Sequence, residues 1–174
     1  MGSVVAILQV LQYPHENLHK MAEPVLNISD DIKKLVQDMF ETMYALNGVG
    51  LAATQVDQHV RVVVIDISEE RNQPIVLINP VITAQEGMVQ SEEGCLSLPG
   101  IYETVTRAER VKVTAVNLDQ ETFSLEADGL LSRCIQHELD HLQGKVFVNY
   151  LSRLKQNRIK TKLIKQSKIR EKAQ

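Results

Sequence analysis

The clearest periodic pattern in the chain lies between residues 29 and 48. Apolar side chains recur there at helical spacing, at Ile32, Leu35, Val36, Met39, Phe40, Met43 and Leu46. Ser29 offers an N-cap oxygen before this stripe, and Asn47-Gly48 is a typical helix stop after it. The pattern therefore predicts an amphipathic helix over 32–46, in which the methionines are core residues rather than metal ligands.

Much of the chain after residue 60 is rich in Val, Ile and Thr, which favours strands. The expected strands span residues 61–67, 75–82, 101–107, 110–118 and 122–127. Their connections are short and carry no helical pattern, so antiparallel or mixed sheets fit better than parallel βαβ units. Residues 4–12 predict a short strand or an extended lead-in that Pro14 ends, and residues 145–150 predict one more short strand. The expected fold class is α+β.

A second helical stripe, over residues 128–143, carries candidate chemistry. Asp128 is a good N-cap for it. His137 and His141 lie four residues apart, so on a helix with 3.6 residues per turn both rings share one face and can reach the same ion. Glu138 completes the pattern H-E-x-x-H, in which the glutamate acts on a metal-bound water. Because so short a pattern also arises by chance, the rest of the chain must support it.

A catalytic site of this kind needs a third protein ligand and an open position for water. The extended pattern with another histidine six residues further on fails, because that position is Phe147. The remaining candidates are Cys95, Cys134, His15, His19 and His59. The three histidines have the neighbours of ordinary surface residues, and Cys134 is better interpreted as a small buried hydrophobe. Cys95 remains. We expect residues 92–99 to form an irregular stretch between strands that presents the Cys95 thiolate to the helix. The alternative is a free loop thiol.

Residues 48–55, Gly-Val-Gly-Leu-Ala-Ala-Thr-Gln, form a bare stretch that ends in an amide. A glycine-rich turn after the first helix is one interpretation. A phosphate loop is disfavoured, because G-x-x-x-x-G-K-[ST] is missing and no strand is predicted to lead into the glycines. A backbone without side chains also suits close approach by the backbone of a ligand.

Composition places the chain among ordinary globular proteins. Its 174 residues are 44% hydrophobic and 24% charged, which predicts one domain with a real core. No apolar run is long enough to span a bilayer, and residues 4–10 are too short and lack the basic leader of a signal peptide. The two cysteines are therefore expected to be thiols in a reducing cytoplasm.

Charge is distributed unevenly along the chain. Residues 151–174 hold nine lysines and arginines and one acid, a formal charge of +8, whereas residues 1–150 carry −11. This split predicts a catalytic domain over 1–150 and a basic, amphipathic helical extension over 151–174 that contacts a polyanion. The alternative for the extension is a solvated surface helix.

Three blocks of the chain together resemble the signature motifs of bacterial peptide deformylases. They are residues 48–55, the segment Glu93-Gly94-Cys95-Leu96-Ser97, and residues 136–142, Gln-His-Glu-Leu-Asp-His-Leu. Their order and separations are similar to those of the family, and the likeness extends roughly from the first helix to Tyr150. The basic C-terminal extension resembles that of the Gram-negative type. The resemblance implies sheets packed around a central helix that carries H-E-x-x-H.

The activity implied by this resemblance is hydrolytic removal of the formyl group from the N-terminal formyl-methionine of nascent chains, with release of formate. By matching positions, Cys95, His137 and His141 are the implied metal ligands. Metal-bound water is expected to attack the formyl carbon, with Glu138 as general base and then general acid.

The remaining roles implied by the family belong to the first two blocks. The Gln55 side-chain amide and the Leu96 backbone N–H are expected to stabilise the oxyanion, and Val49 and Gly50 to pair with the peptide backbone. Ligand spacing alone suggests zinc, whereas the family implies Fe²⁺, with Zn²⁺, Ni²⁺ or Co²⁺ able to replace it. The expected partners are formylated nascent peptides and, transiently, the ribosome through the basic helix. A monomer that does not associate with membranes is expected.

The chain departs from the family pattern at a few positions. Ser91 stands where an aliphatic residue is frequent, Tyr102 where many relatives have arginine, and Arg133 where an apolar residue is usual. These changes concern the shape of the methionine pocket. Two other functions are considered: a general H-E-x-x-H metallopeptidase, which no downstream third ligand supports, and a non-catalytic ribosome-docked module with a closed structural metal site.

Overall fold

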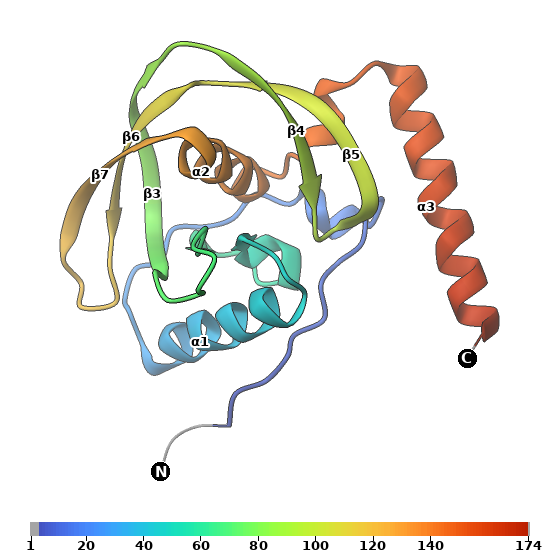
Figure 1. Ribbon diagram of the computed structural model, residues 1–174. Helices are drawn as coiled ribbons and strands as arrows, with labels where there is room; N and C mark the ends of the chain where they lie inside the picture. The colour runs from blue at the N-terminus through green and yellow to red at the C-terminus, as the bar shows by residue number, and fades with distance from the viewer. Residues whose placement is uncertain (1–3, 174) are drawn as a thin grey trace.

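The computed structural model describes residues 4–173; residues 1–3 and 174, at the two ends of the predicted catalytic domain and extension, lie outside it. In this structure, α2 (Gly129–Leu142) occupies the centre, and antiparallel strands curve around it (Figure 1). One sheet has the strand order β1-β2-β3-β6-β7, and β4 pairs with β5 in the other. The strands are β1 (Gly50–Ala52), β2 (Val62–Ile65), β3 (Ile75–Glu86), β4 (Val89–Cys95), β5 (Leu98–Arg107), β6 (Arg110–Val116) and β7 (Thr122–Asp128). The predicted α+β class is confirmed.

The first predicted helix is present as α1 (Asp30–Ala45). The Ser29 hydroxyl accepts a hydrogen bond from the Ile32 amide at 3.4 Å, as expected of an N-cap. Met39 and Met43 are fully buried in a hydrophobic cluster that α1 forms with β2. The methionines are therefore core residues, as the spacing predicted.

The helix α2 is held in place by a second hydrophobic cluster. Ile135, Leu139 and Leu142 pack there against Val63 and Leu77 of the larger sheet. Asp128 occupies the N-cap position, but its side chain makes no capping hydrogen bond. Because the apolar stripe of α2 faces the sheet, the opposite side of the helix is left to carry polar side chains.

The prediction of an irregular stretch over 92–99 is wrong. β4 and β5 form a hairpin in which Glu92 pairs with Thr104 and Cys95 with Leu98 (Figure 1). The sequence pattern missed β4 because most of its side chains are exposed or half-buried, so no apolar alternation marks it. Cys95 therefore lies at the end of a strand. The bare stretch over 48–55 likewise contains β1 and the 3₁₀ turn η2 (Ala53–Val56).

The short strand predicted over 145–150 is also wrong, because the 3₁₀ turn η3 (Phe147–Tyr150) lies there. Val146, Phe147 and Val148 are all buried, which an extended strand with alternating faces would not achieve next to solvent. Gly144 leads into this segment with φ +76°, and a Cβ there would lie 2.3 Å from the carbonyl oxygen of His19. Glycine is therefore required where the chain leaves α2.

The two ends of the chain pack differently. Residues 4–12 form no strand, so the alternative of an extended lead-in is correct; the Ala6 and Leu8 amides donate to Asp38 and Thr42 of α1. The turn η1 (Glu16–His19) follows.

The predicted basic helix is present as α3 (Arg153–Ala173), with Ile159 and Leu163 buried. Over residues 4–173, none of the helices combines the length and hydropathy that crossing a bilayer requires.

Candidate active site

Three side chains with metal-binding atoms converge where β4 ends beside α2. Sγ of Cys95 lies 3.4 Å from Nε2 of His141, which lies 3.3 Å from Nε2 of His137. All three candidate ligand atoms lie within 4.8 Å of one another. Tetrahedral ligands at the usual distances from one ion lie roughly 3.3–3.6 Å apart, so this thiolate and two imidazoles fit a single divalent metal. The strand end and two successive helical turns thus create the donor set.

The glutamate between the two histidines lies at the same place. Glu138 is 3% exposed, and its Oε1 has no hydrogen-bond partner among the residues that the structure describes. Burial raises the pKa of Glu138 to about 7, against the opposing effect of His137. A buried carboxylate with a free oxygen and a pKa in this range is suited to accept and return a proton near neutral pH.

Gly50 on β1 packs directly against this carboxylate. A Cβ at position 50 would lie 2.6 Å from Oε2 of Glu138 and 2.7 Å from Sγ of Cys134. The backbone of β1 therefore closes one side of the site in the space that a side chain would fill. Glycine is needed at position 50 so that β1 can lie this close to Glu138. The sequence pattern predicted a close approach of this kind for the backbone of a ligand.

Gln55 is fixed with its amide group turned toward Cys95. Its Oε1 accepts a hydrogen bond from the Ala52 amide at 2.9 Å, and its Nε2 lies 3.2 Å from Oγ of Ser97 and 3.5 Å from Sγ of Cys95. The side chain is 1% exposed. Because its carbonyl is already engaged, the amide nitrogen is the atom that faces the metal-binding atoms.

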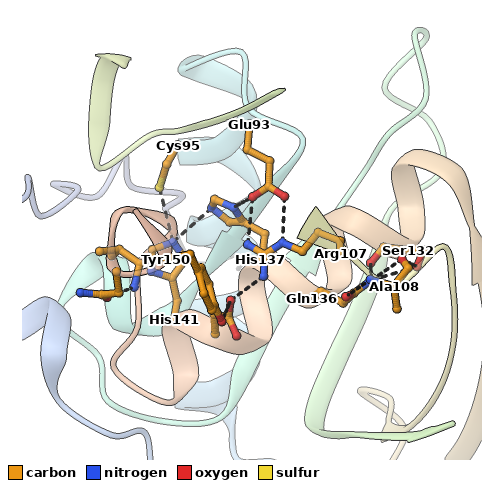
Figure 2. A network of polar contacts seen from close by, with 12 residues as sticks. Glu93, Cys95, Arg107, Ala108, Ser132, Gln136, His137, His141 and Tyr150 are labelled. Atoms are coloured by element: carbon orange, nitrogen blue, oxygen red, sulfur yellow. Dashed lines mark hydrogen bonds and ion pairs between the residues drawn. The ribbon is translucent and has the colours of Figure 1, made fainter. Parts of the chain in front are cut away.

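A chain of charged side chains supports His137 from behind (Figure 2). Glu93 lies 2.9 Å from Nδ1 of His137 and accepts two hydrogen bonds from Arg107. Arg107 also donates to Asp140 at 2.6 Å, and Asp140 accepts from the Tyr150 hydroxyl at 2.8 Å. These contacts fix the orientation of the ring and leave its Nε2 free to bind a metal.

Glu93 stays ionised in this network despite its burial. Burial alone would raise the pKa of Glu93, but the hydrogen bonds and positive charge of Arg107 and His137 outweigh it and lower the pKa to about 2. Glu93 is thus an anion next to a candidate metal ligand. Sequence reasoning assigned no role to Glu93, Arg107, Asp140 or Tyr150. One signal was available, since Arg107 takes an inward position on β5 in phase with the buried Val105.

A cleft of about 680 Å³ leads from the surface to the converging side chains. Val49, Gly50 and Gln55 line one side, and Cys95 and Leu96 line another. The Val49 carbonyl oxygen accepts a hydrogen bond from the Asp66 amide at 2.8 Å. A ligand that binds this oxygen must therefore use its second lone pair. The structure thus brings the predicted binding residues to the wall of one cleft.

The three other histidines lie elsewhere, whereas Cys134 lines the cleft without belonging to the group of converging ligand atoms. His19 contacts the Gly144 carbonyl, and His59 pairs with Asp57 at 2.8 Å. The ring of His15 accepts from the Asn17 amide. Cys134 is buried in the hydrophobic cluster around α2, where burial raises the pKa of its thiol well above the ordinary value. Both cysteines are free thiols, as predicted.

Comparison with known proteins identifies the family. A family model described as polypeptide deformylase matches residues 7–157. The peptide deformylase of Neisseria meningitidis serogroup B is 63% identical over 164 residues, which cover 94% of this chain and 98% of the relative. That of Chromobacterium violaceum is 59% identical over 164 residues, with the same coverage of 94% and 98%.

Solved structures agree with the sequence comparisons. A peptide deformylase from Legionella pneumophila matches with a TM-score of 0.92 at 44% identity, covering 95% of this chain and 98% of that chain. The peptide deformylase from Ehrlichia chaffeensis in complex with actinonin matches with a TM-score of 0.90 at 38% identity, covering 93% and 98%. The resemblance inferred from the three blocks is confirmed. The chain belongs to the peptide deformylase family, whose members are hydrolases that remove N-terminal formyl groups from nascent chains.

Proposed function

We propose that this chain hydrolyses the formyl group from the N-terminal formyl-methionine of nascent polypeptides and releases formate, using one divalent metal ion. The observation that carries the proposal is the convergence of Cys95, His137 and His141 within 4.8 Å, with the buried carboxylate of Glu138 beside them. An ion held by these side chains would act as a Lewis acid that polarises the formyl carbonyl and lowers the pKa of a bound water.

Glu138 moves the proton in this proposal. Its carboxylate takes a proton from the attacking water and delivers it to the leaving amine as the carbon–nitrogen bond breaks. The water oxygen stays on formate, and the peptide leaves with a free amino group. Burial raises the pKa of Glu138, which favours its holding the proton between the two halves of this task.

The developing oxyanion is stabilised by two donors. One is the Gln55 amide nitrogen, whose direction is fixed by the hydrogen bond from the Ala52 amide to the Gln55 carbonyl. The other is the backbone N–H of Leu96, at the turn between β4 and β5. Removing a donor of this type typically costs about 2.7–4 kcal/mol of transition-state stabilisation.

The peptide backbone pairs with Val49 and Gly50 at the free edge of the larger sheet. β1 is the edge strand of that sheet, with β2 on its other side. A substrate strand added at this edge is held by main-chain hydrogen bonds, so many sequences bind alike. The cleft offers methionine an apolar surface made by Leu46, Leu98 and Leu130. Two residues at which this chain departs from the family pattern, Tyr102 and Arg133, also line the cleft.

Fe²⁺ is the proposed native ion, with Zn²⁺, Ni²⁺ or Co²⁺ able to substitute. The single thiolate and two imidazoles suit any of these borderline metals. The enzyme is proposed to act in the cytoplasm as a monomer, with residues 1–150 as the catalytic domain. Residues 151–174 are proposed to make transient contact with the ribosome.

The proposal is tested by measuring formate released from a formyl-Met peptide by protein purified without oxygen and analysed for metal. The wild-type protein should release formate, and Glu138→Ala should keep fold and metal while losing nearly all activity. Actinonin, which is bound in the Ehrlichia chaffeensis relative, should inhibit the reaction. Cleavage of internal peptide bonds without formate release would instead indicate a general metallopeptidase, and a metal without either activity would indicate a structural site.

A further inference from the structure

Two arginines that the reaction does not use line the same cleft as the metal-binding side chains. Arg133 lies on α2, four residues before His137, and is half-buried. Arg170 reaches the cleft from the last turns of α3, which runs beside β5 (Figure 1). Neither arginine forms an ion pair within residues 4–173. Arg107, by contrast, is fully occupied by Glu93 and Asp140.

The carboxylates that line the cleft leave this positive charge in excess. Glu93 is taken by Arg107 and His137, and Glu138 serves the reaction. Glu92 is exposed on β4 and is the remaining acid of the lining. Two uncommitted guanidinium groups thus stand against one uncommitted carboxylate. The uncommitted charge at the cleft is therefore positive, whereas residues 1–150 as a whole carry a formal charge of −11.

The position of the arginines fits the part of a substrate that follows the methionine. Four residues of helix separate the Cα atoms of Arg133 and His137 by about 6 Å along the axis, and an extended peptide advances about 3.3 Å per residue. A peptide whose formyl end lies at His137 and which runs toward the N-terminus of α2 would bring its second or third side chain within reach of Arg133. Solvent screens a contact at the half-buried Arg133 less than a contact at Arg170, which is exposed.

Resting on the proposed function, we propose that Arg133 and Arg170 make this enzyme prefer formyl-methionine peptides with an acidic side chain at the second or third residue. A guanidinium group binds a carboxylate through two parallel hydrogen bonds, whereas a glutamine offers a single uncharged acceptor oxygen and a lysine offers none. The end of α3 is then part of the substrate cleft.

The test compares kcat/KM for formyl-Met peptides that differ only in carrying Glu, Gln or Lys at the second residue, with amidated C-termini. At low salt the wild-type protein should favour the Glu peptide over the Lys peptide by about fivefold or more, and added salt should reduce this ratio. Arg133→Gln and Arg170→Gln should each lower the ratio, and together bring it close to one. Lys168→Gln, an exposed cation on the same helix outside the cleft lining, should leave it unchanged.

A wild-type ratio of one or below would overturn the preference, as would a ratio that survives both Arg substitutions. The Gln peptide separates a change in preference from a general loss of activity in any variant. If Arg133→Gln does not fold, Arg170→Gln and the salt dependence of the wild-type ratio still decide the question. Absence of formate from all three peptides would contradict the proposed function itself, whereas equal rates would contradict only the preference.

Discussion

Arg107 is the side chain on which the support of the metal site depends. It is 5% exposed and holds both Glu93 and Asp140. Replacing it by leucine leaves Glu93 buried with half of its partners lost, so Arg107→Leu should lower the free energy of unfolding by about 3 kcal/mol. It should also weaken metal binding by about 10–100-fold, because Glu93 orients His137. Denaturant unfolding and metal titration measure the two effects.

The matched control is Arg110→Leu. Arg110 pairs with Glu86 on the surface, where the two side chains are 53% and 71% exposed. Solvent screens this pair, so the substitution should leave both stability and metal affinity nearly unchanged. Equal losses in the two variants would show that burial of the Arg107 network has no special role.

Gly50 tests the close packing between β1 and the proposed proton carrier. Gly50→Ala places a methyl group 2.6 Å from Oε2 of Glu138, so either the carboxylate or the strand must shift. Because displacements of about 1 Å can cost about 100-fold in rate, formate release should fall by at least about tenfold. The control is Gly48→Ala, whose methyl meets only the flexible end of Leu96 at 2.8 Å and should have a smaller effect. Similar rates for the two variants would contradict this account.

At the scale of elements, the N-termini of α1 and α2 provide a matched pair. The Ser29 hydroxyl caps α1 by accepting a hydrogen bond from the Ile32 amide, whereas the Asp128 side chain makes no capping bond to α2. Ser29→Ala should lower the free energy of unfolding by about 0.5–1 kcal/mol, and Asp128→Ala by less. Thermal or denaturant unfolding of both variants gives the comparison. A larger loss for Asp128→Ala would mean that helix-dipole charge outweighs the capping bond.

Elements with a strong local pattern of residue types could be predicted from the sequence, and β4, which has none, could not. α1 and α2 are recognisable by apolar stripes at helical spacing, and β2 and β6 by β-branched residues. β4 escaped because its pairing with β5 depends on backbone hydrogen bonds between polar residues. The turn η3 was mistaken for a strand because a short apolar run has no period that separates the two.

The candidate site divides in the same way. The spacing of His137 and His141 follows from helix geometry, and elimination left Cys95, so the converging side chains could be predicted. The Glu93–Arg107 pair could not, since it joins residues on two strands of a hairpin whose first strand was not recognised. Arg133 was expected near the methionine pocket, but Arg170 could not be placed at the cleft, because the end of α3 is distant from α2 in sequence.

At the scale of the whole molecule, α3 combines a packing face with a charged face. Ile159 and Leu163 are buried in a hydrophobic cluster with Phe147, so deleting residues 153–174 would uncover the core as well as remove charge. Replacing the exposed Lys160, Lys162 and Lys165 by glutamine isolates the charge. This triple variant should bind ribosomes more weakly and with a shallower salt dependence, at unchanged formate release. Unchanged binding in co-sedimentation would contradict the proposed contact.

The claim on which the account depends is that one ion is held by Cys95, His137 and His141 with a position left for solvent. X-ray absorption spectroscopy of the metal-loaded protein tests it most directly, with Cys95→Ala as the comparison. The predicted result is one sulfur at about 2.3 Å, two imidazole nitrogens at about 2.0–2.1 Å and one exchangeable oxygen, with the sulfur signal lost in the variant. A first shell without sulfur, or one with four protein ligands and no exchangeable oxygen, would contradict it.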